Sequence, residues 1–391
     1  DTGLLCHCSG IECGTVEFLV WTEALPNIVK GKRDFFMISG IICEFNPFHA
    51  GHKHLIDQVK CHPGDAVVCV MSGNFVQRGT FAVYDKRART ETALKGGADL
   101  VLELPTAYAT RSAEGFARAG VQLLEATGVV ERLAFGTECT DLQALTALAG
   151  EIKAHQGEIA QVMKTGCSYP AARRQVIDSP LLDTPNNILA LEYMECTQLP
   201  CTCVQRLGLG HDTADPLYSA SAIRATLPAE AIYSIEHCQR GVLAVLRRME
   251  AADWAAIDDV TDGLENRLAR AAQSATSLEE LYTTIKTKRY THARIRRIVL
   301  RAYLGIGKGD YPATPPYLRV LGFNAAGKAL LAKMQHSATL PTVTRMADVK
   351  ALSPEGQALF RLESRCTDLY ALGAKKPLPG GAEQRLQIVS T

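Results

Sequence analysis

Two histidines lie three residues apart in the segment ISGIICEFNPFHAGHKHL, which runs from Ile38 to Leu55. Imidazole N–H groups can stabilise the charge that develops on a phosphate during in-line displacement. Between His49 and His52 lies Gly51, which has no Cβ and would let a nucleotide lie against the backbone. These residue types predict a nucleotide site in which both histidines are catalytic. The alternative is that the pair only caps or packs a helix.

The sequence around the histidines indicates the elements that must position them. The apolar run 38–43 is typical of a strand buried on both faces, and Asn46-Pro47 marks a turn. We therefore expect a helix to begin near His52, where backbone N–H groups favour anions such as a triphosphate. Strand, turn, glycine and helix together favour the nucleotide interpretation over simple capping.

Four short apolar segments alternate with helical patterns: 38–43, 66–71, 99–104 and 132–135. This alternation predicts an α/β fold, a Rossmann-like parallel sheet with helices on both faces. Ligands of such sheets bind at the carboxyl ends of the strands, so the polar turns that follow these strands should converge on one crevice.

The chain has 391 residues, which favours two domains. We expect an N-terminal extension of unknown origin over 1–36, a nucleotidylyltransferase-like ATP-binding domain over 37–227, a mostly helical domain over 228–374 and a flexible Pro/Gly-rich tail over 375–391. With 47% hydrophobic and 21% charged residues, the composition is that of a soluble globular protein. The net charge of +1 means that binding to nucleic acid has to be argued from local patches.

The thirteen cysteines are an odd number at irregular spacings, which predicts reduced thiols in a cytoplasmic protein. The pairs Cys6-x-Cys8 and Cys201-x-Cys203 lack the C-x2-C units of a zinc site, so we predict no bound metal. Residues 1–36 have no basic region followed by a long apolar core and do not resemble a signal peptide.

A basic segment, KTKRYTHARIRRIVLR at 286–301, carries seven Lys or Arg residues and no acid. On a helix its arginines would share a face beside an apolar stripe, and two tyrosines lie nearby. Such a face suits RNA, although a merely solvated helix face is the alternative. The predicted RNA contacts are Lys288, Arg289, Arg294, Arg297 and Arg301.

The segment YSASAIR at 218–224 offers Ser219, Ser221 and Arg224 at the start of a predicted helix. Hydroxyl groups, backbone donors and a guanidinium can together hold the β- and γ-phosphates of a nucleotide. Taken alone, the segment could be a simple helix cap. Combined with the upstream HxGH turn, it resembles the paired phosphate contacts of the HIGH-type nucleotidylyltransferase superfamily.

A closer resemblance rests on several segments in the same order: GIICEFNPFHAGH, MSGNFVQRG, DLVLELP, RSAEGFA, AFGTE, PNNILALEY, KRYTHARIRR and PYLRVLGF. Over about residues 38–323 the chain resembles the bacterial tRNA(Met) cytidine acetate ligase family. The resemblance implies that acetate is activated by ATP, with Mg²⁺, to acetyl-adenylate. The acetyl group then passes to N4 of the wobble cytidine of elongator tRNA(Met), giving N4-acetylcytidine, AMP and pyrophosphate.

The resemblance also implies an ATP site. It comprises Gly136, Asn187 and Arg206 together with Ile42, Cys43, Glu44, Phe45, Asn46, Pro47, Phe48, His49, Gly51, His52 and Leu55.

The family segment SGNFxQRGEP reads SGNFVQRGTF here, with Thr80 and Phe81 in place of Glu and Pro. We expect Asn74, Gln77 and Arg78 to line the active site and to meet acetate or tRNA.

HxGH alone identifies only the superfamily, so two other functions stay open. One is an adenylyltransferase that acts on a small phosphorylated metabolite. The other is a nucleotide- or RNA-binding protein without catalysis.

Overall fold

The computed structural model describes residues 37–207 and 219–391, except 262 and 386. The predicted N-terminal extension, with Cys6 and Cys8, lies outside the described residues. All the strands and helices below belong to the described part of the chain.

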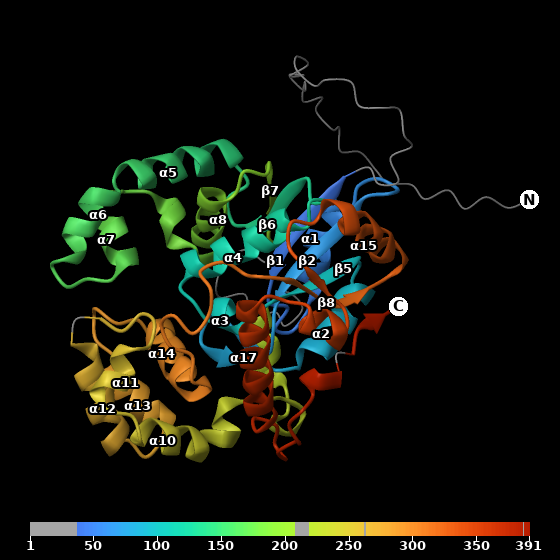
Figure 1. Cartoon of the computed structure of the whole chain (residues 1–391). Coiled ribbons are helices and arrows are strands. Elements are labelled where there is room, and N and C mark those ends of the chain that lie inside the picture. The colour runs from blue at the N-terminus through green and yellow to red at the C-terminus, as the bar shows by residue number, and fades with distance from the viewer. Residues whose placement is uncertain (1–36, 208–218, 262, 386) are drawn as a thin grey trace, which may run out of the picture. The chain divides into compact units, whose positions relative to one another are not determined.

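The strands form an eight-stranded sheet of order β10–β8–β5–β2–β1–β6–β7, with β9 paired to β8 (Figure 1). Neighbouring strands are parallel except for β5 and β8, which are antiparallel. The predicted parallel α/β sheet is thus confirmed, with one antiparallel pair. The strands are β1 (Ile38–Cys43), β2 (Ala66–Ser72), β5 (Leu100–Leu104), β6 (Arg132–Thr137), β7 (Cys201–Gln205), β8 (Leu318–Phe323), β9 (Thr342–Val343) and β10 (Val389–Ser390).

Helices cover both faces of this sheet, as predicted. Every residue of β1, β2 and β5 is buried, because alternate side chains enter two separate hydrophobic clusters. Ile41 packs in the cluster of α1 and α2, whereas Ile42 packs in the cluster of α4, α8 and α15. These helices are α1 (Ala50–Val59), α2 (Lys86–Lys95), α4 (Ala113–Ala126), α8 (Pro185–Cys196) and α15 (Ala325–Ser337).

Two glycines let α4 lie close to the central strand. A Cβ on Gly40 of β1 would lie 2.8 Å from Leu124 Cδ1, and a Cβ on Gly120 of α4 would lie 2.8 Å from Ile42 Cδ1. Each glycine faces a side chain of the other element. Helix α4 can therefore lie close to the strand that leads into the HxGH turn.

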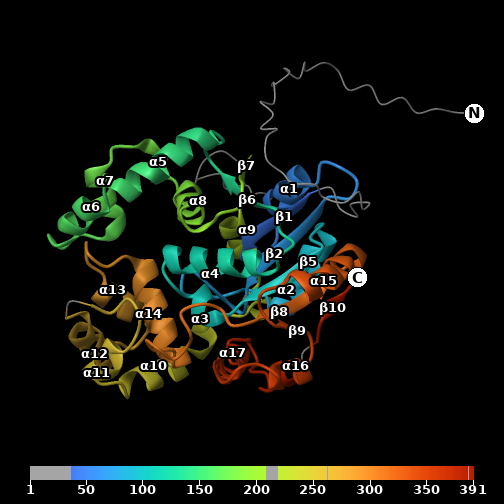
Figure 2. The ribbon, with the colours of Figure 1, turned by 45° about the horizontal axis from the view of Figure 1, so that its top comes forward.

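Helices α5 (Leu142–Ala154), α6 (Gln156–Met163) and α7 (Tyr169–Val176) follow β6 and pack around a third hydrophobic cluster (Figure 2). Single 3-10 turns occur at Pro180–Asp183, Ala229–Ala231, Ile235–Cys238 and Glu383–Arg385.

The second half of the chain is mostly helical, as predicted. Its helices are α9 (Ala220–Thr226), α10 (Gln239–Arg247), α11 (Ala251–Ala255), α12 (Leu264–Ser274), α13 (Leu278–Ile285), α14 (His292–Leu304), α16 (Met346–Lys350) and α17 (Pro354–Ala371).

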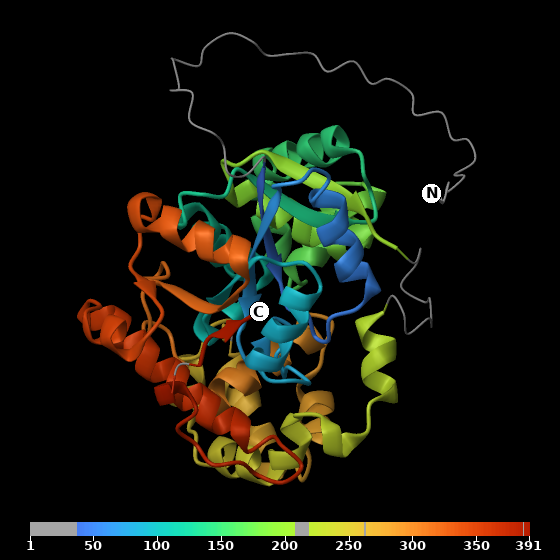
Figure 3. The same cartoon turned by 90° about the vertical axis from the view of Figure 1, so that its right-hand side faces the viewer.

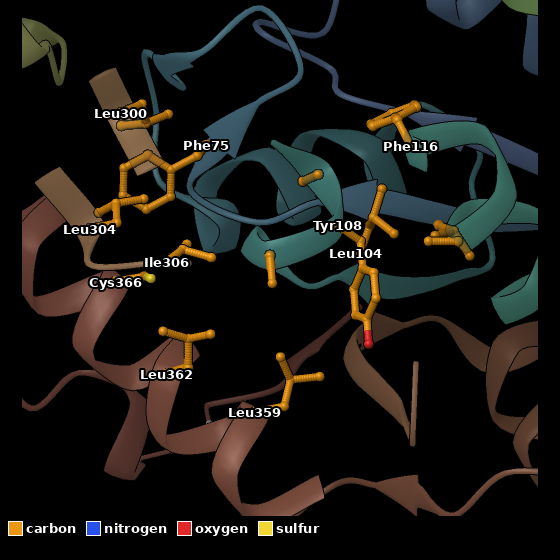
Figure 4. Close-up of a cluster of buried hydrophobic side chains, with 14 of the residues drawn as sticks. Phe75, Leu104, Tyr108, Phe116, Leu300, Leu304, Ile306, Leu359, Leu362 and Cys366 are labelled. Atoms are coloured by element: carbon orange, nitrogen blue, oxygen red, sulfur yellow. The ribbon is translucent and has the colours of Figure 1, made fainter. Parts of the chain in front are cut away.

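The helical half shares its core with the sheet half. Figure 4 shows Leu300 and Leu304 of α14 beside Phe75, which lies in a short hairpin after β2. Leu362 and Cys366 of α17 face the same buried cluster. The two halves therefore pack against each other through apolar side chains.

The predicted division of the chain does not account for strands β8, β9 and β10. They come from segments assigned to the helical domain and the flexible tail, yet they extend the sheet beyond β5. β10 ends beside α2 (Figure 3). Glu383, in the predicted tail, is only 2% exposed. The physical reason is that β5 would otherwise be an edge strand with unpaired backbone groups, and LRVLGF supplies an apolar partner.

The hairpin of β3 (Phe75–Val76) and β4 (Thr80–Phe81) docks on α14 through its turn. Gly79 has a φ of +78°, and a Cβ there would lie 2.3 Å from the backbone nitrogen of Arg297. This contact joins two segments that the sequence marked separately, the SGNFVQRG loop and the basic helix.

Replacing Gly79 with Ala should lower the free energy of unfolding by about 2 kcal/mol or more, because an L side chain resists this φ and collides with α14. Urea denaturation measures the change. Gly157→Ala is the matched control, since this glycine lies in α6 with no atom within 4 Å of the added Cβ. Equal denaturation midpoints for the two variants would refute the docking contact.

Candidate active site

Helix α1 begins directly at the two histidines, and both of them cap it. His49 is the N-cap, and its Nδ1 accepts a hydrogen bond from the Gly51 backbone N–H at 3.0 Å. Nδ1 of His52 accepts from the His49 backbone N–H at 3.3 Å. The capping alternative is therefore correct for one ring nitrogen of each histidine. Because Nδ1 accepts, the proton of each neutral ring is on Nε2, which is left as a donor.

The two imidazoles act as a pair of neutral donors. Their rings stack with centroids 3.8 Å apart. Burial lowers the pKa of His49 to about 4, with further lowering by the charges of Arg206 and Arg224. Burial also lowers the pKa of His52 well below its usual value, helped by His49 and Arg206. At neutral pH both rings can thus donate Nε2–H without carrying a charge.

We expect the ring signals of His49 in an NMR titration to move at a pH of about 4, and those of His52 at a pH well below 6.5. Both pKa values are depressed in the folded protein. Below a pH of about 6.5 the histidines of the unfolded chain therefore bind protons, whereas those of the folded chain stay neutral. The contribution of the pair to stability is therefore lost as the pH falls. Titration of either ring near 6.5 would contradict the buried pair.

The loop between β1 and α1 is tightly held. Phe45 has a positive φ of 44°, which is strained for a non-glycine residue. Its ring packs edge-on against His52, with centroids 4.9 Å apart, and against Phe48 at 5.0 Å. Asn46 Oδ1 accepts from the Val83 backbone N–H at 2.8 Å, and the Asn46–Pro47 peptide is cis. The loop is thereby fixed around the histidine pair.

Three apolar residues of the predicted ATP loop belong to or pack against the hydrophobic core. Ile42 and Cys43 are buried in β1, and Leu55 packs on the cluster under α1. Ile42 packs on one face of the sheet, whereas Cys43 and Leu55 pack on the other.

Arg224 connects the predicted phosphate-binding segment at 218–224 to this loop. Ser219 is the N-cap of α9, and its Oγ accepts from the Ala222 backbone N–H at 3.3 Å. Arg224 donates from Nη1 to the Asn46 carbonyl at 2.6 Å and from Nη2 to Ser221 Oγ at 3.2 Å. The two motifs, far apart in sequence, therefore meet at one place.

Arg206 reaches the site from the end of β7. Its Nη1 donates to Asn186 Oδ1 at 2.9 Å, and its Nε lies 3.9 Å from Glu138 Oε1. Gly136 lies beside Arg206: a Cβ on this glycine would be 3.4 Å from Arg206 Cγ, an ordinary contact distance. The charge of Arg206 affects both histidines, so the end of β7, a strand that the sequence did not predict, lies near the turn that follows β1.

Asn187 has a different position from the one expected. It is 2% exposed, and its Oδ1 accepts from the backbone N–H groups of Glu138 and Cys139, each at 3.1 Å. Its oxygen therefore shapes the turn after β6 and is not presented to a ligand. The physical reason is that buried backbone donors need an acceptor, and a short amide side chain supplies one.

Two residues that organise the site were not predicted from the sequence. Glu138 binds Asn186 and faces Arg206, and its place directly after a strand next to Gly136 could have indicated it. Arg89 is buried and donates to the carbonyls of Glu44, Ser72 and Gly73, which ties the ends of β1 and β2 together. Nothing in the sequence marks Arg89 among the other basic residues of α2.

The SGNFVQRG loop divides into a structural and an accessible part. Asn74 is 2% exposed, and its amide bonds Thr367 and the Lys86 backbone, so it does not line the site as expected. The backbone N–H of Gln77 donates to Glu44 Oε1 at 2.6 Å, and Arg78 is exposed. The loop thus reaches the ATP loop through its tip.

Phe81, where the family has proline, is buried against Phe75 and Tyr370 with ring centroids 5.0 and 5.4 Å away.

Comparisons with known proteins show which family the chain is similar to. The model of the family HIGH Nucleotidyl Transferase matches residues 36–244 and 229–385. The tRNA(Met) cytidine acetate ligase of Acetivibrio thermocellus is 33% identical, over 87% of this chain and 96% of that protein. The ligase of the same name from Syntrophomonas wolfei is 36% identical, over 86% of this chain and 94% of that protein.

The chain belongs to the tRNA(Met) cytidine acetate ligase family. This membership confirms the resemblance found in the sequence motifs. A crystal structure of Thermotoga maritima TmcAL bound with alpha-thio ATP has a TM-score of 0.80 and 28% identity, and the match covers 91% of this chain and 100% of that one.

The basic helix α14 departs from the RNA-binding face expected for a family member. Arg301 is 1% exposed and bonds Asp258 together with the Ala107 carbonyl. Arg297 is buried against Asp259, and Arg294 donates to the Asp259 carbonyl at 2.6 Å. These three arginines hold α14 in place, because a buried guanidinium requires acceptors. The prediction that they form an open RNA-binding face is wrong for Arg297 and Arg301.

Of the other predicted RNA contacts, Lys288 is exposed and Arg289 is half-buried, just before α14. The part of the chain that the structure describes has no helix long and apolar enough to span a membrane. Within the same residues, no group of three or more His, Cys, Asp or Glu side chains is placed to hold a metal ion.

Proposed function

We propose that this protein activates acetate with ATP to form acetyl-adenylate and transfers the acetyl group to N4 of the wobble cytidine of elongator tRNA(Met). The products would be N4-acetylcytidine, AMP and pyrophosphate. The observation that carries the proposal is the stacked pair of neutral imidazoles at the start of α1, with Arg206 and Arg224 beside it.

In the first step, an acetate oxygen attacks the α-phosphorus of ATP in line and pyrophosphate leaves. His49 and His52 donate Nε2–H to the oxygens that gain charge on the α-phosphate, and their fixed rings cost little reorganisation. Arg206 and Arg224 with Ser221 bind the outer phosphates. ATP enters as its Mg²⁺ complex, so the metal arrives with the substrate. No covalent enzyme intermediate is needed.

In the second step, the cytidine amine attacks the acetyl carbon of the adenylate. This amine is poorly basic because its lone pair is delocalised into the ring, so it requires an activated acyl donor. The wobble base has to be turned out of the anticodon loop to reach the site, as in other sequence-specific RNA recognition.

We assign tRNA binding to the helical region 228–374, with Lys288 and Arg289 before α14 as the remaining contacts. Arg78 on the tip of the hairpin is exposed and lies between that region and the ATP loop, so we also assign it to tRNA or acetate. We also propose that the protein acts in the cytoplasm, because its proposed substrate is tRNA.

The test is to incubate the protein with ATP, labelled acetate and total tRNA, and to locate the label. Label in N4-acetylcytidine of tRNA(Met) is the expected result. AMP transferred to a phosphorylated metabolite would indicate an adenylyltransferase instead, and ATP binding without turnover would indicate a non-catalytic protein.

A further inference from the structure

Glu44 is a carboxylate at the active site that the activation step leaves unused. It is the first residue after β1, and Phe45, which packs on the His52 ring, follows it directly. Its Oε1 accepts from the Gln77 backbone N–H at 2.6 Å. Its Oε2 has no hydrogen-bond partner among residues 37–207 and 219–391. One oxygen is thus anchored while the other remains available.

The surroundings of Glu44 come from five segments: β1, the β3–β4 hairpin, α2, α8 and α9. Burial raises the pKa of its carboxyl group, and the bond from Gln77 and the charges of Arg78, Arg89 and Arg224 lower it, with burial the larger effect. Cys43 and Tyr193 also face this carboxylate. A carboxylate with a raised pKa accepts a proton more readily near neutral pH.

Arg224 connects Glu44 to the reacting centre. Its charge acts on both Glu44 and His49, and its guanidinium bonds the Asn46 carbonyl in the loop between them. Glu44 and the imidazole pair therefore lie at the two ends of one loop, which begins at the carboxyl end of β1, and Arg224 acts on both.

We propose that Glu44 is the general base of the acetyl-transfer step. This inference rests on the proposed function. As the bond from N4 of cytidine to the acetyl carbon forms, the bond from that carbon to the AMP oxygen breaks, and AMP leaves with the electron pair. One N4 proton passes to Glu44 Oε2.

The other groups of the site are less suited to this role. Each histidine presents Nε2–H, which donates and cannot accept, and its Nδ1 is occupied by a backbone N–H. Both oxygens of Glu138 are engaged, Oε1 by Asn186 and Oε2 by the Asn187 backbone N–H. Activation of acetate releases no proton, whereas transfer to an amine must remove one, so the available carboxylate matches the second step.

The test uses Glu44→Gln, which keeps an oxygen to accept from Gln77 but cannot take a proton. Two rates are measured on the full chain: acetate-dependent ATP–pyrophosphate exchange, and single-turnover transfer from enzyme-bound acetyl-adenylate to tRNA(Met). We expect transfer to fall by about a hundredfold and exchange by no more than about fivefold. The wild-type transfer rate should rise with pH as the carboxyl group ionises and then level off, and this dependence should disappear in Glu44→Gln.

Two further variants separate a base from a structural group. Glu44→Asp keeps a carboxylate and should retain the rise of transfer with pH at a reduced rate. Glu138→Gln is the matched control, because it changes a carboxylate that contacts Arg206 and should slow exchange and transfer in proportion.

Transfer by Glu44→Gln at the wild-type rate and with the wild-type pH dependence would overturn the inference. Equal loss of exchange and transfer in this variant would also overturn it and would assign Glu44 to activation. If the wild-type protein forms no acetyl-adenylate, the proposed function itself fails, and that result is seen before any variant is measured.

Discussion

Replacing His52 with Ala should lower the rate of acetate-dependent ATP–pyrophosphate exchange by about 100- to 1,000-fold, the usual cost of losing one preorganised donor to a developing oxyanion. The ring is held by the His49 backbone N–H, by stacking on His49 and by the edge of Phe45. Its Nε2–H is therefore already in place before the reaction, and alanine removes it without a substitute.

Two substitutions separate this role from capping. His52→Asn can still accept from the His49 backbone with an oxygen near the position of Nδ1, but it has no donor near the position of Nε2. His52→Gln has the opposite properties. We expect Gln to retain more exchange activity than Asn, and Asn to retain more thermal stability than Gln. His54→Ala, on the same helix, is the control and should keep normal exchange. Near-normal exchange in His52→Ala would refute the assignment.

Replacing Lys86 with Met should lower the free energy of unfolding by about 3–5 kcal/mol, because breaking a buried ionic cluster leaves uncompensated charge. Lys86 Nζ lies 2.6 Å from Glu103 Oε1, contacts Glu383 and lies 3.8 Å from Glu363. Arg319 bonds Glu103 at 2.7 Å and also contacts Glu383. Two cations are thus paired with three buried carboxylates.

The charge balance of this cluster explains why the lysine is needed. Burial and the neighbouring Glu103 raise the pKa of Glu363 to about 7, whereas Lys86 and Arg319 overcome burial and lower the pKa of Glu383 to about 2. Glu363 therefore takes up a proton more readily than Glu383. Without Lys86, Arg319 alone would face the carboxylates.

Urea denaturation of Lys86→Met measures the loss. Lys95→Met, at the exposed end of the same helix, should change stability little. Adding Glu383→Gln to Lys86→Met should recover part of the loss, because it removes one of the unpaired charges. Full stability of the single variant would contradict an ionic cluster that holds the fold.

The centre of the site could be predicted from the sequence because its geometry is local. His49, Gly51 and His52 belong to one helix start, so spacing alone places them together. Ser221 and Arg224 are also one local unit, and only the sheet determines that they meet Asn46. The family resemblance added the function, which no spacing indicates.

Residues with long-range partners were the ones misplaced. Whether Arg301 faces RNA or is buried depends on Asp258 and on the Ala107 carbonyl, which lie far away in the sequence. Asn74 and Asn187 likewise have amide groups that suit a ligand or a buried backbone equally well. The sequence alone does not distinguish a polar side chain that binds a ligand from one that bonds the buried backbone. The difference depends on its neighbours in space.

Strand β8 and Glu383 have a consequence for how the molecule is made. β8 pairs with β5, and Glu383 completes the cluster around Lys86, although both come late in the chain. The nucleotide-binding half would thus leave the ribosome with β5 uncovered until β8 is made, and with Lys86 lacking the Glu383 carboxylate until residue 383 is made. Final packing of the catalytic half has to wait for the end of translation, so a nascent chain stalled before residue 383 is a natural client for chaperones.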